Sequence, residues 1–162
     1  MTTEWPESVE RVARFLRDAM VEARVEEFAD GTPTAEDAAL AVGCSLGQIV
    51  KSLVFLCDGR AILVMVPGDR RADPAKVQAA AGCGRAKVAG PDDVRRATGF
   101  EPGAVAPFPL PAIEDVFADH ALLAHEVVWV GAGSNRHMAA LSPSDLVRLS
   151  HARAIDAVAE TT

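Results

Sequence analysis

The sequence has no tyrosine, few other aromatic residues and no long hydrophobic run. Aromatic residues make up 5% of the 162 positions, and the longest uninterrupted aliphatic run covers only residues 61–66. Such a run is far too short to cross a membrane, which takes about 20 residues. Hydrophobic residues are nevertheless 49% of the chain and charged residues 24%, as in ordinary globular proteins. We therefore expect one globular domain over residues 1–162, with no membrane partner.

The sequence also lacks the usual marks of a disulfide framework, a metal site or a nucleotide-binding loop. Its three cysteines, Cys44, Cys57 and Cys83, form no C-x-x-C pair and are odd in number. This pattern favours free buried thiols over disulfides or a zinc knuckle. The four histidines have no metal-ligand spacing, and no G-x-x-x-x-G-K-[ST] motif is present. We expect no metal and no cofactor.

The charge is negative overall but unevenly placed. The net charge is −7, yet residues 38–96 hold nine bases against five acids. A basic middle could face an anion, although charge alone favours ordinary scatter as the explanation. The N-terminal stretch is acidic where a secretory signal peptide is basic and then apolar, so we expect a cytoplasmic protein.

Hydrophobic periodicity and turn residues indicate helices and strands in irregular alternation. Helices are expected at residues 6–20, 35–42, 74–82, 91–98 and 143–150. Strands are expected at residues 23–28, 49–57, 61–66, 86–88, 116–118 and 126–130. Asp58-Gly59 predicts a hairpin between the second and third of these strands. The mixture indicates a single α/β domain, with a mixed central sheet forming an open, barrel-like core and helices around it.

Residues 43–47 match the G-x-S-x-G pattern of serine hydrolases, with Ser45 at its centre. That pattern marks a nucleophile only on a turn that leads from a strand into a helix. Here a helix precedes the motif and a strand follows it. We therefore expect Ser45 to satisfy backbone groups in a turn rather than to act in catalysis.

Lys51 interrupts a run otherwise suited to a buried strand. It is one of only three lysines in the chain, and its neighbours in residues 49–57 are mostly apolar. Burying an ammonium group is costly unless it meets an anion or several acceptors. The pattern alone leaves two readings open: a lysine on the solvent face of an edge strand, or a lysine that faces an anionic ligand.

Two further segments combine glycine with unusual local composition. Residues 103–107 are followed by more proline and form an apolar loop that can be neither a central strand nor a helix. Such a loop can hold a small ligand by backbone hydrogen bonds, or it can be a packed surface connection. Residues 131–137 form a polar turn after a buried strand, which suits either an anion-binding concavity or a hairpin.

Taken together, these segments resemble the YbaK/EbsC family of aminoacyl-tRNA editing domains, which are related to the insertion domain of prolyl-tRNA synthetase. The resemblance runs over about residues 24–150 and leaves the helix expected at 6–20 outside its strongest part. The similar stretches, in chain order, are residues 34–39, 48–55, 97–108, 133–134 and 141–146. The strand with Lys51 and the downstream G-x-x-x-P loop are the most specific of them.

The resemblance implies hydrolysis of the ester that joins a wrong, small amino acid to tRNA, with no metal and no covalent nucleophile. Lys51 would be the catalytic residue and would help to hold the terminal adenosine and the aminoacyl group. The substrate-binding residues would be Gly103, Ala104, Val105, Ala106, Pro107, Gly133, Ser134, Asn135 and His137. Water would attack the ester carbonyl, with help from a ribose hydroxyl of the tRNA. The implied partners are the acceptor end of aminoacyl-tRNA and an aminoacyl-tRNA synthetase of the prolyl type.

The chain departs from the family pattern at two places. Pro109-Leu110-Pro111 follows the Pro-Phe pair where many members have glycine, and residues 138–140 hold no acid. These departures bear on which amino acid is removed, and the sequence names neither that amino acid nor the oligomeric state. The alternative function is a non-catalytic module of the same fold that binds tRNA or a synthetase.

Overall fold

The computed structural model describes residues 5–21 and 23–160. Its α-helices are α1 (Glu7–Asp18), α2 (Ala35–Val42), α3 (Pro74–Ala81), α4 (Pro91–Thr98) and α5 (Pro143–Ser150), with short 3-10 helices η1 (Leu46–Gln48) and η2 (His120–Ala124). Its strands are β1 (Arg24–Glu27), β2 (Val50–Cys57), β3 (Arg60–Pro67), β4 (Ala86–Val88), β5 (Val116–Asp119), β6 (Val128–Ser134), β7 (His137–Leu141) and β8 (Arg153–Ile155). In these residues no helix is long and apolar enough to span a membrane.

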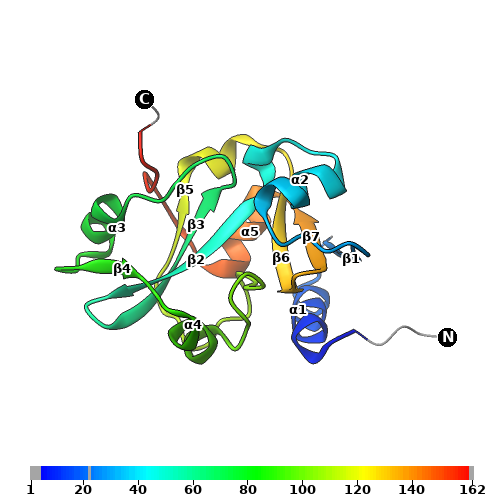
Figure 1. Ribbon diagram of the computed structural model, residues 1–162, viewed down its shortest axis with the longest axis horizontal. Coiled ribbons are helices and arrows are strands. Elements are labelled where there is room, and N and C mark those ends of the chain that lie inside the picture. Colours follow the sequence, from blue (N-terminus) through cyan, green and yellow to red (C-terminus); the bar gives the residue numbers. More distant parts are fainter. Residues whose placement is uncertain (1–4, 22, 161–162) are drawn as a thin grey trace.

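The strands are divided between two sheets. A three-stranded antiparallel sheet has the order β1-β7-β6, and a five-stranded mixed sheet has the order β4-β2-β3-β5-β8. Figure 1 shows the smaller sheet beside α1 at one end of the molecule, with α3 and β4 at the other end. A parallel bridge between Ile49 and Trp129 links the two sheets. The expected mixed α/β fold is confirmed, and the described strands do not close into a barrel.

Local signals in the sequence account for most element boundaries. Thr34 caps α2 by accepting the Asp37 N–H, and Ser142 caps α5 by accepting the Asp145 N–H. Asp58 and Gly59 both have positive φ, at 51° and 87°, as the expected hairpin turn requires. Ser45 donates both its backbone N–H and its hydroxyl to Gln48 Oε1, so it lies in a local turn, but its hydroxyl bonds a side chain rather than the backbone groups expected.

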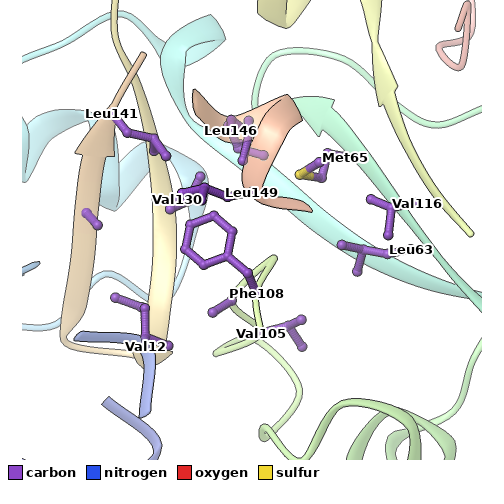
Figure 2. Packing of buried hydrophobic residues seen from close by; sticks show 14 of the residues in the cluster. Val12, Leu63, Met65, Val105, Phe108, Val116, Val130, Leu141, Leu146 and Leu149 are labelled. Carbon is purple, nitrogen blue, oxygen red and sulfur yellow. The ribbon is translucent and has the colours of Figure 1, made fainter. Parts of the chain in front are cut away.

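One large hydrophobic core joins both sheets to α1, α5 and the loop at residues 99–115. In Figure 2 the ring of Phe108, from this loop, lies in the same cluster as Val130 of β6 and Leu149 of α5. Val105 of the same loop is also buried in this core. The loop therefore has no regular structure but is fixed by packing, as its apolar composition suggested.

The expectation of free thiols is wrong for two of the three cysteines. Cys57 and Cys83 form a disulfide, with their Cα atoms 5.7 Å apart, while Cys44 is a free, half-buried thiol. Cys57 ends β2, and the antiparallel pairing of β2 with β4 brings the turn after α3 beside it. The number and spacing of the cysteines could not predict this disulfide, because it depends on how distant strands pair.

The expected polar turn at residues 131–137 is shorter than the sequence indicated. Strand β6 continues to Ser134, and β7 begins at His137, so only Asn135 and Arg136 form the turn. Glycine and serine have low strand propensity, so the sequence did not predict that β6 continues beyond residue 130. The register of β6 on β7 shifts between Gly131 and Ser134, and this irregularity places Ser134 opposite His137.

Candidate functional site

A cavity of about 330 Å³ lies where the two sheets meet. Strands β2 and β6 touch at the Ile49–Trp129 bridge, and beyond it they belong to different sheets. The cavity is lined by residues 32–35 and Ala38 around the start of α2, by residues 49–53 of the β2 edge, by Gly103 and Val105, by Gly131 and Ser134, and by His137 and Met138. Its volume is at the small end of the range for ligand pockets, roughly 300–1,000 Å³.

The loop that carries Gly103 and Val105 closes one side of this cavity. A Cβ atom on Gly131 would lie 2.9 Å from the Val105 carbonyl oxygen, so only glycine lets the loop approach β6 so closely. Gly103 has a φ of +84°, and a Cβ there would meet nothing within 4 Å. Glycine is therefore required at 103 by backbone conformation rather than by crowding.

Lys51 is half-buried on the cavity wall formed by β2. Its Nζ donates a hydrogen bond to the Arg70 carbonyl oxygen at 2.6 Å. Burial lowers the pKa of Lys51, while Glu36 raises it and Arg71 lowers it. An ammonium group has three N–H donors, so the carbonyl leaves donors and positive charge for a ligand in the cavity.

The opposite wall carries a buried histidine in contact with polar side chains. Nδ1 of His137 lies 2.6 Å from Ser134 Oγ, and Nε2 lies 3.1 Å from Glu27 Oε2. The ring of Trp5 packs edge-on against the imidazole, with centroids 5.3 Å apart. Burial lowers the pKa of His137, while the Glu27 carboxylate raises it and Arg136 lowers it.

Helix α1 supports this wall from behind. Ser8 Oγ donates a hydrogen bond to the Gly133 carbonyl oxygen at 2.7 Å. A Cβ atom on Gly133, whose φ is +100°, would lie 2.5 Å from the Ser8 carbonyl oxygen. The N-terminal helix, outside the strongest part of the resemblance, thus packs directly against a segment of the cavity wall.

The structure brings five of the ten expected site residues to the cavity. These are Lys51, Gly103, Val105, Ser134 and His137. The other five lie nearby but do not line it. Ala104 and Ala106 are buried in the loop, Pro107 lines a second cavity, Gly133 faces α1, and Asn135 sits in the exposed turn, where its carbonyl oxygen accepts the Thr32 N–H.

Sequence reasoning missed several residues of the site. Ser52 Oγ is buried in the wall and has no hydrogen-bond partner among the described residues. Thr32, Pro33 and the start of α2 cover the cavity from a different part of the chain. Glu27 reaches His137 only because β1 pairs with β7. Nothing in the local sequence signals that pairing.

A metal centre is not evident in the parts of the chain that the structure describes. No three His, Cys, Asp or Glu side chains there are grouped closely enough to hold a metal ion. The chemistry available at the cavity is that of an ammonium group, a neutral imidazole next to a carboxylate, four hydroxyls (Thr32, Thr34, Ser52 and Ser134) and backbone groups.

Comparison with known proteins identifies the family of this chain. Residues 29–149 match the profile of the aminoacyl-tRNA editing domain. The chain belongs to the aminoacyl-tRNA editing domain family. The matched residues include every side chain that lines the cavity, whereas Glu27 and α1 fall outside them.

Relatives of this editing domain occur both as short proteins and inside a larger enzyme. The chain is 34% identical over 130 residues to an uncharacterized protein, YwhH, of Bacillus subtilis, covering 80% of this chain and 82% of the relative. It is 34% identical over 113 residues to a proline–tRNA ligase of Maridesulfovibrio salexigens, covering 69% of this chain but only 19% of the ligase. A solved structure of a proposed trans-editing enzyme for prolyl-tRNA synthetase superimposes with a TM-score of 0.91 at 34% identity, covering 97% of this chain and 100% of the other.

Proposed function

We propose that this protein is a hydrolase that removes a small, wrongly attached amino acid from tRNA, acting in trans to the synthetase. The observation that carries the proposal is the meeting of Lys51, the Gly103–Val105 backbone and His137 around one small cavity. Those residues come from distant parts of the chain, and the family model covers all of them.

The reaction suits a site of this kind. An aminoacyl ester is activated toward hydrolysis, so positioning of water and substrate can provide much of the rate. Lys51 would bind the anionic or ester oxygens of the tRNA terminus, and the loop would contact the aminoacyl group. Gly133, Asn135, Ala104, Ala106 and Pro107 would support these contacts rather than make them. The proposed mechanism uses no metal and no covalent intermediate.

The small volume supports a small amino acid. A cavity of about 330 Å³ that must also admit part of a ribose leaves little space for a large side chain. Trans action is supported by the similarity to YwhH and to the proposed trans-editing enzyme, each matched over most of its length. A prolyl-type synthetase is the partner that the ligase relatives suggest.

The test is a deacylation panel with Ala-, Cys-, Ser-, Thr- and Pro-tRNA, run with EDTA and with excess substrate over enzyme. We expect multiple turnover of at least one mischarged tRNA, with no loss of rate in EDTA. If no substrate is hydrolysed above the buffer rate at micromolar protein, the proposal is wrong. Tight binding of tRNA without turnover would then favour the non-catalytic module.

A further inference from the structure

Three polar side chains from three strands form a continuous chain on one wall of the cavity. Glu27 comes from β1, His137 from β7 and Ser134 from β6. The imidazole of His137 is 2% exposed, whereas the Glu27 carboxylate is 45% exposed. Ser134 and His137 both line the cavity, so one end of this chain of contacts faces the space where a substrate would lie.

The contacts of Ser134 favour one protonation state of this chain of side chains. Ser134 Oγ accepts the backbone N–H of Arg136 at 2.9 Å, which leaves its own hydrogen free to donate. Among the described residues, His137 Nδ1 lies within reach of that hydrogen, at 2.6 Å. A neutral imidazole accepts on one nitrogen and donates from the other, so if Ser134 donates to Nδ1, the His137 proton is on Nε2.

Glu27 is placed to stabilise that tautomer. Its Oε2 lies 3.1 Å from Nε2, although the contact is not aligned as a hydrogen bond, and Nε2 has no other partner among the described residues. The charged groups that bear on His137 are Glu27 from β1 and Arg136 from the turn, while Trp5, which precedes α1, contributes an uncharged ring. Burial, the largest influence, lowers the pKa of His137 and keeps the ring neutral near pH 7.

We propose that Ser134, His137 and Glu27 form a proton relay that activates the attacking water, an inference that rests on the proposed deacylase function. The water oxygen bonds to the ester carbonyl carbon, and the carbonyl π pair moves to its oxygen. One water proton passes to Ser134 Oγ as the serine proton passes to His137 Nδ1. The intermediate then collapses, the bond to the ribose oxygen breaks, and that oxygen takes the proton back through Ser134.

The products balance as free amino acid and a tRNA hydroxyl. In this scheme the protein itself, and not only a ribose hydroxyl of the tRNA, takes the proton from water. Ser134 and His137 are catalytic residues because they move the reacting proton, and Glu27 is a positioning residue because it acts through His137. Glu27 lies outside residues 29–149, which match the family model.

The kinetic test compares Ser134→Ala and Glu27→Gln with wild-type protein on whichever mischarged tRNA the wild type deacylates. Ser144→Ala and Glu26→Gln are matched controls, because Ser144 lies on α5 away from the cavity and Glu26 pairs with Arg24. We expect Ser134→Ala to lower kcat about 100-fold with little change in KM, as expected for loss of a positioned proton acceptor. Both controls should keep the wild-type kcat.

The pH profile separates a relay from a merely structural role. His137 accepts a proton only when neutral, so kcat should fall as the pH drops through its pKa. The negative charge of Glu27 raises that pKa, so Glu27→Gln should move the acid limb to lower pH as well as reduce the plateau. A structural role would change stability but leave the position of the limb unchanged.

Nitrogen-15 NMR of the imidazole tests the relay without any substrate. We expect His137 to carry its proton on Nε2 in the wild type at neutral pH. A proton on Nδ1, unchanged kcat in Ser134→Ala, or an acyl group trapped on Ser134 in quenched reactions would each overturn the relay while leaving the deacylase function in place. Absence of turnover by the wild type would instead overturn the deacylase function, whatever the tautomer.

Discussion

The two walls of the cavity hold their polar groups in different ways. On the wall from the five-stranded sheet, the Lys51 side chain donates to a backbone carbonyl and leaves further N–H donors for a ligand. On the wall from the three-stranded sheet, His137 is held by the side chains of Ser134, Glu27 and Trp5. The first arrangement suits attraction of an anionic substrate, and the second suits control of a proton. We infer that the site separates binding from proton transfer between its two sheets.

The largest expected effect is a loss of stability where α1 packs against β6 of the three-stranded sheet. Gly133→Ala places a Cβ atom 2.5 Å from the Ser8 carbonyl oxygen at a φ of +100°. Backbone strain of about 1–2 kcal/mol and overpacking of about 1–3 kcal/mol should together lower the free energy of unfolding by about 2–5 kcal/mol. Urea denaturation measures this.

Gly43→Ala is the matched control for that substitution. Gly43 also has positive φ, +75°, but a Cβ there meets nothing within 4 Å. Its free energy of unfolding should fall by only about 1–2 kcal/mol, from backbone strain. Equal losses in the two variants would show that the contact between α1 and β6 is not the cause.

The second effect concerns the charge on the other wall. Lys51→Ala should lower kcat/KM for deacylation about 10- to 100-fold, because a hydrogen bond to a charged group is worth about 1.5–3 kcal/mol. The fold should be retained, since the Lys51 side chain makes a single hydrogen bond to the residues that the structure describes. Lys87→Ala, at an exposed position on β4, is the control and should keep normal kinetics. Near-normal rates in a folded Lys51→Ala variant would place Lys51 outside the site.

The third effect concerns the loop between the two walls. Gly103→Val should lower kcat/KM about tenfold, since about 1–2 kcal/mol of backbone strain at positive φ would shift the loop away from its bound form. Gly82→Val is the control. Gly82 also has a positive φ, +71°, and open space around a Cβ, but it lies at the end of α3. An equal loss of activity in both variants would mean that the loop at 103 has no special role.

The smallest effect is the response of tRNA binding to salt. A net charge of −7 opposes long-range attraction to a polyanion. Only a few basic groups, such as Lys51, Arg71 and Arg136, lie on or beside the cavity. We expect weak tRNA binding and a shallow slope of the logarithm of the binding constant against the logarithm of salt concentration, corresponding to roughly two to four phosphate contacts. Nanomolar affinity at physiological salt would indicate a separate tRNA-binding surface.

The sequence predicted most elements because their signals are local. The caps Thr34 and Ser142, the Asp58-Gly59 turn and the strand around Lys51 each depend on residues within a few positions. Strands β7 and β8 were missed, and β6 was cut short. In the β6–β7 hairpin the glycine and serine residues resemble a loop.

The site was predicted less completely because it depends on distant pairings. Lys51 and the loop at residues 103–107 stand out as exceptions to local rules, and the family resemblance linked them. Glu27 and the Cys57–Cys83 disulfide depend on how β1 pairs with β7 and β2 with β4. The packing of α1 against Gly133 likewise has no local signal.

The central claim is that the aminoacyl end of tRNA binds in the cavity between the two sheets. The most direct measurement is an NMR titration with a non-hydrolysable 3′-aminoacylamino-adenosine that carries a small amino acid. We expect the largest chemical-shift changes at Lys51, Ser52, Gly103 and His137. Changes centred instead on the second cavity, at Phe15 and Leu110, or no saturable change at all, would contradict the account.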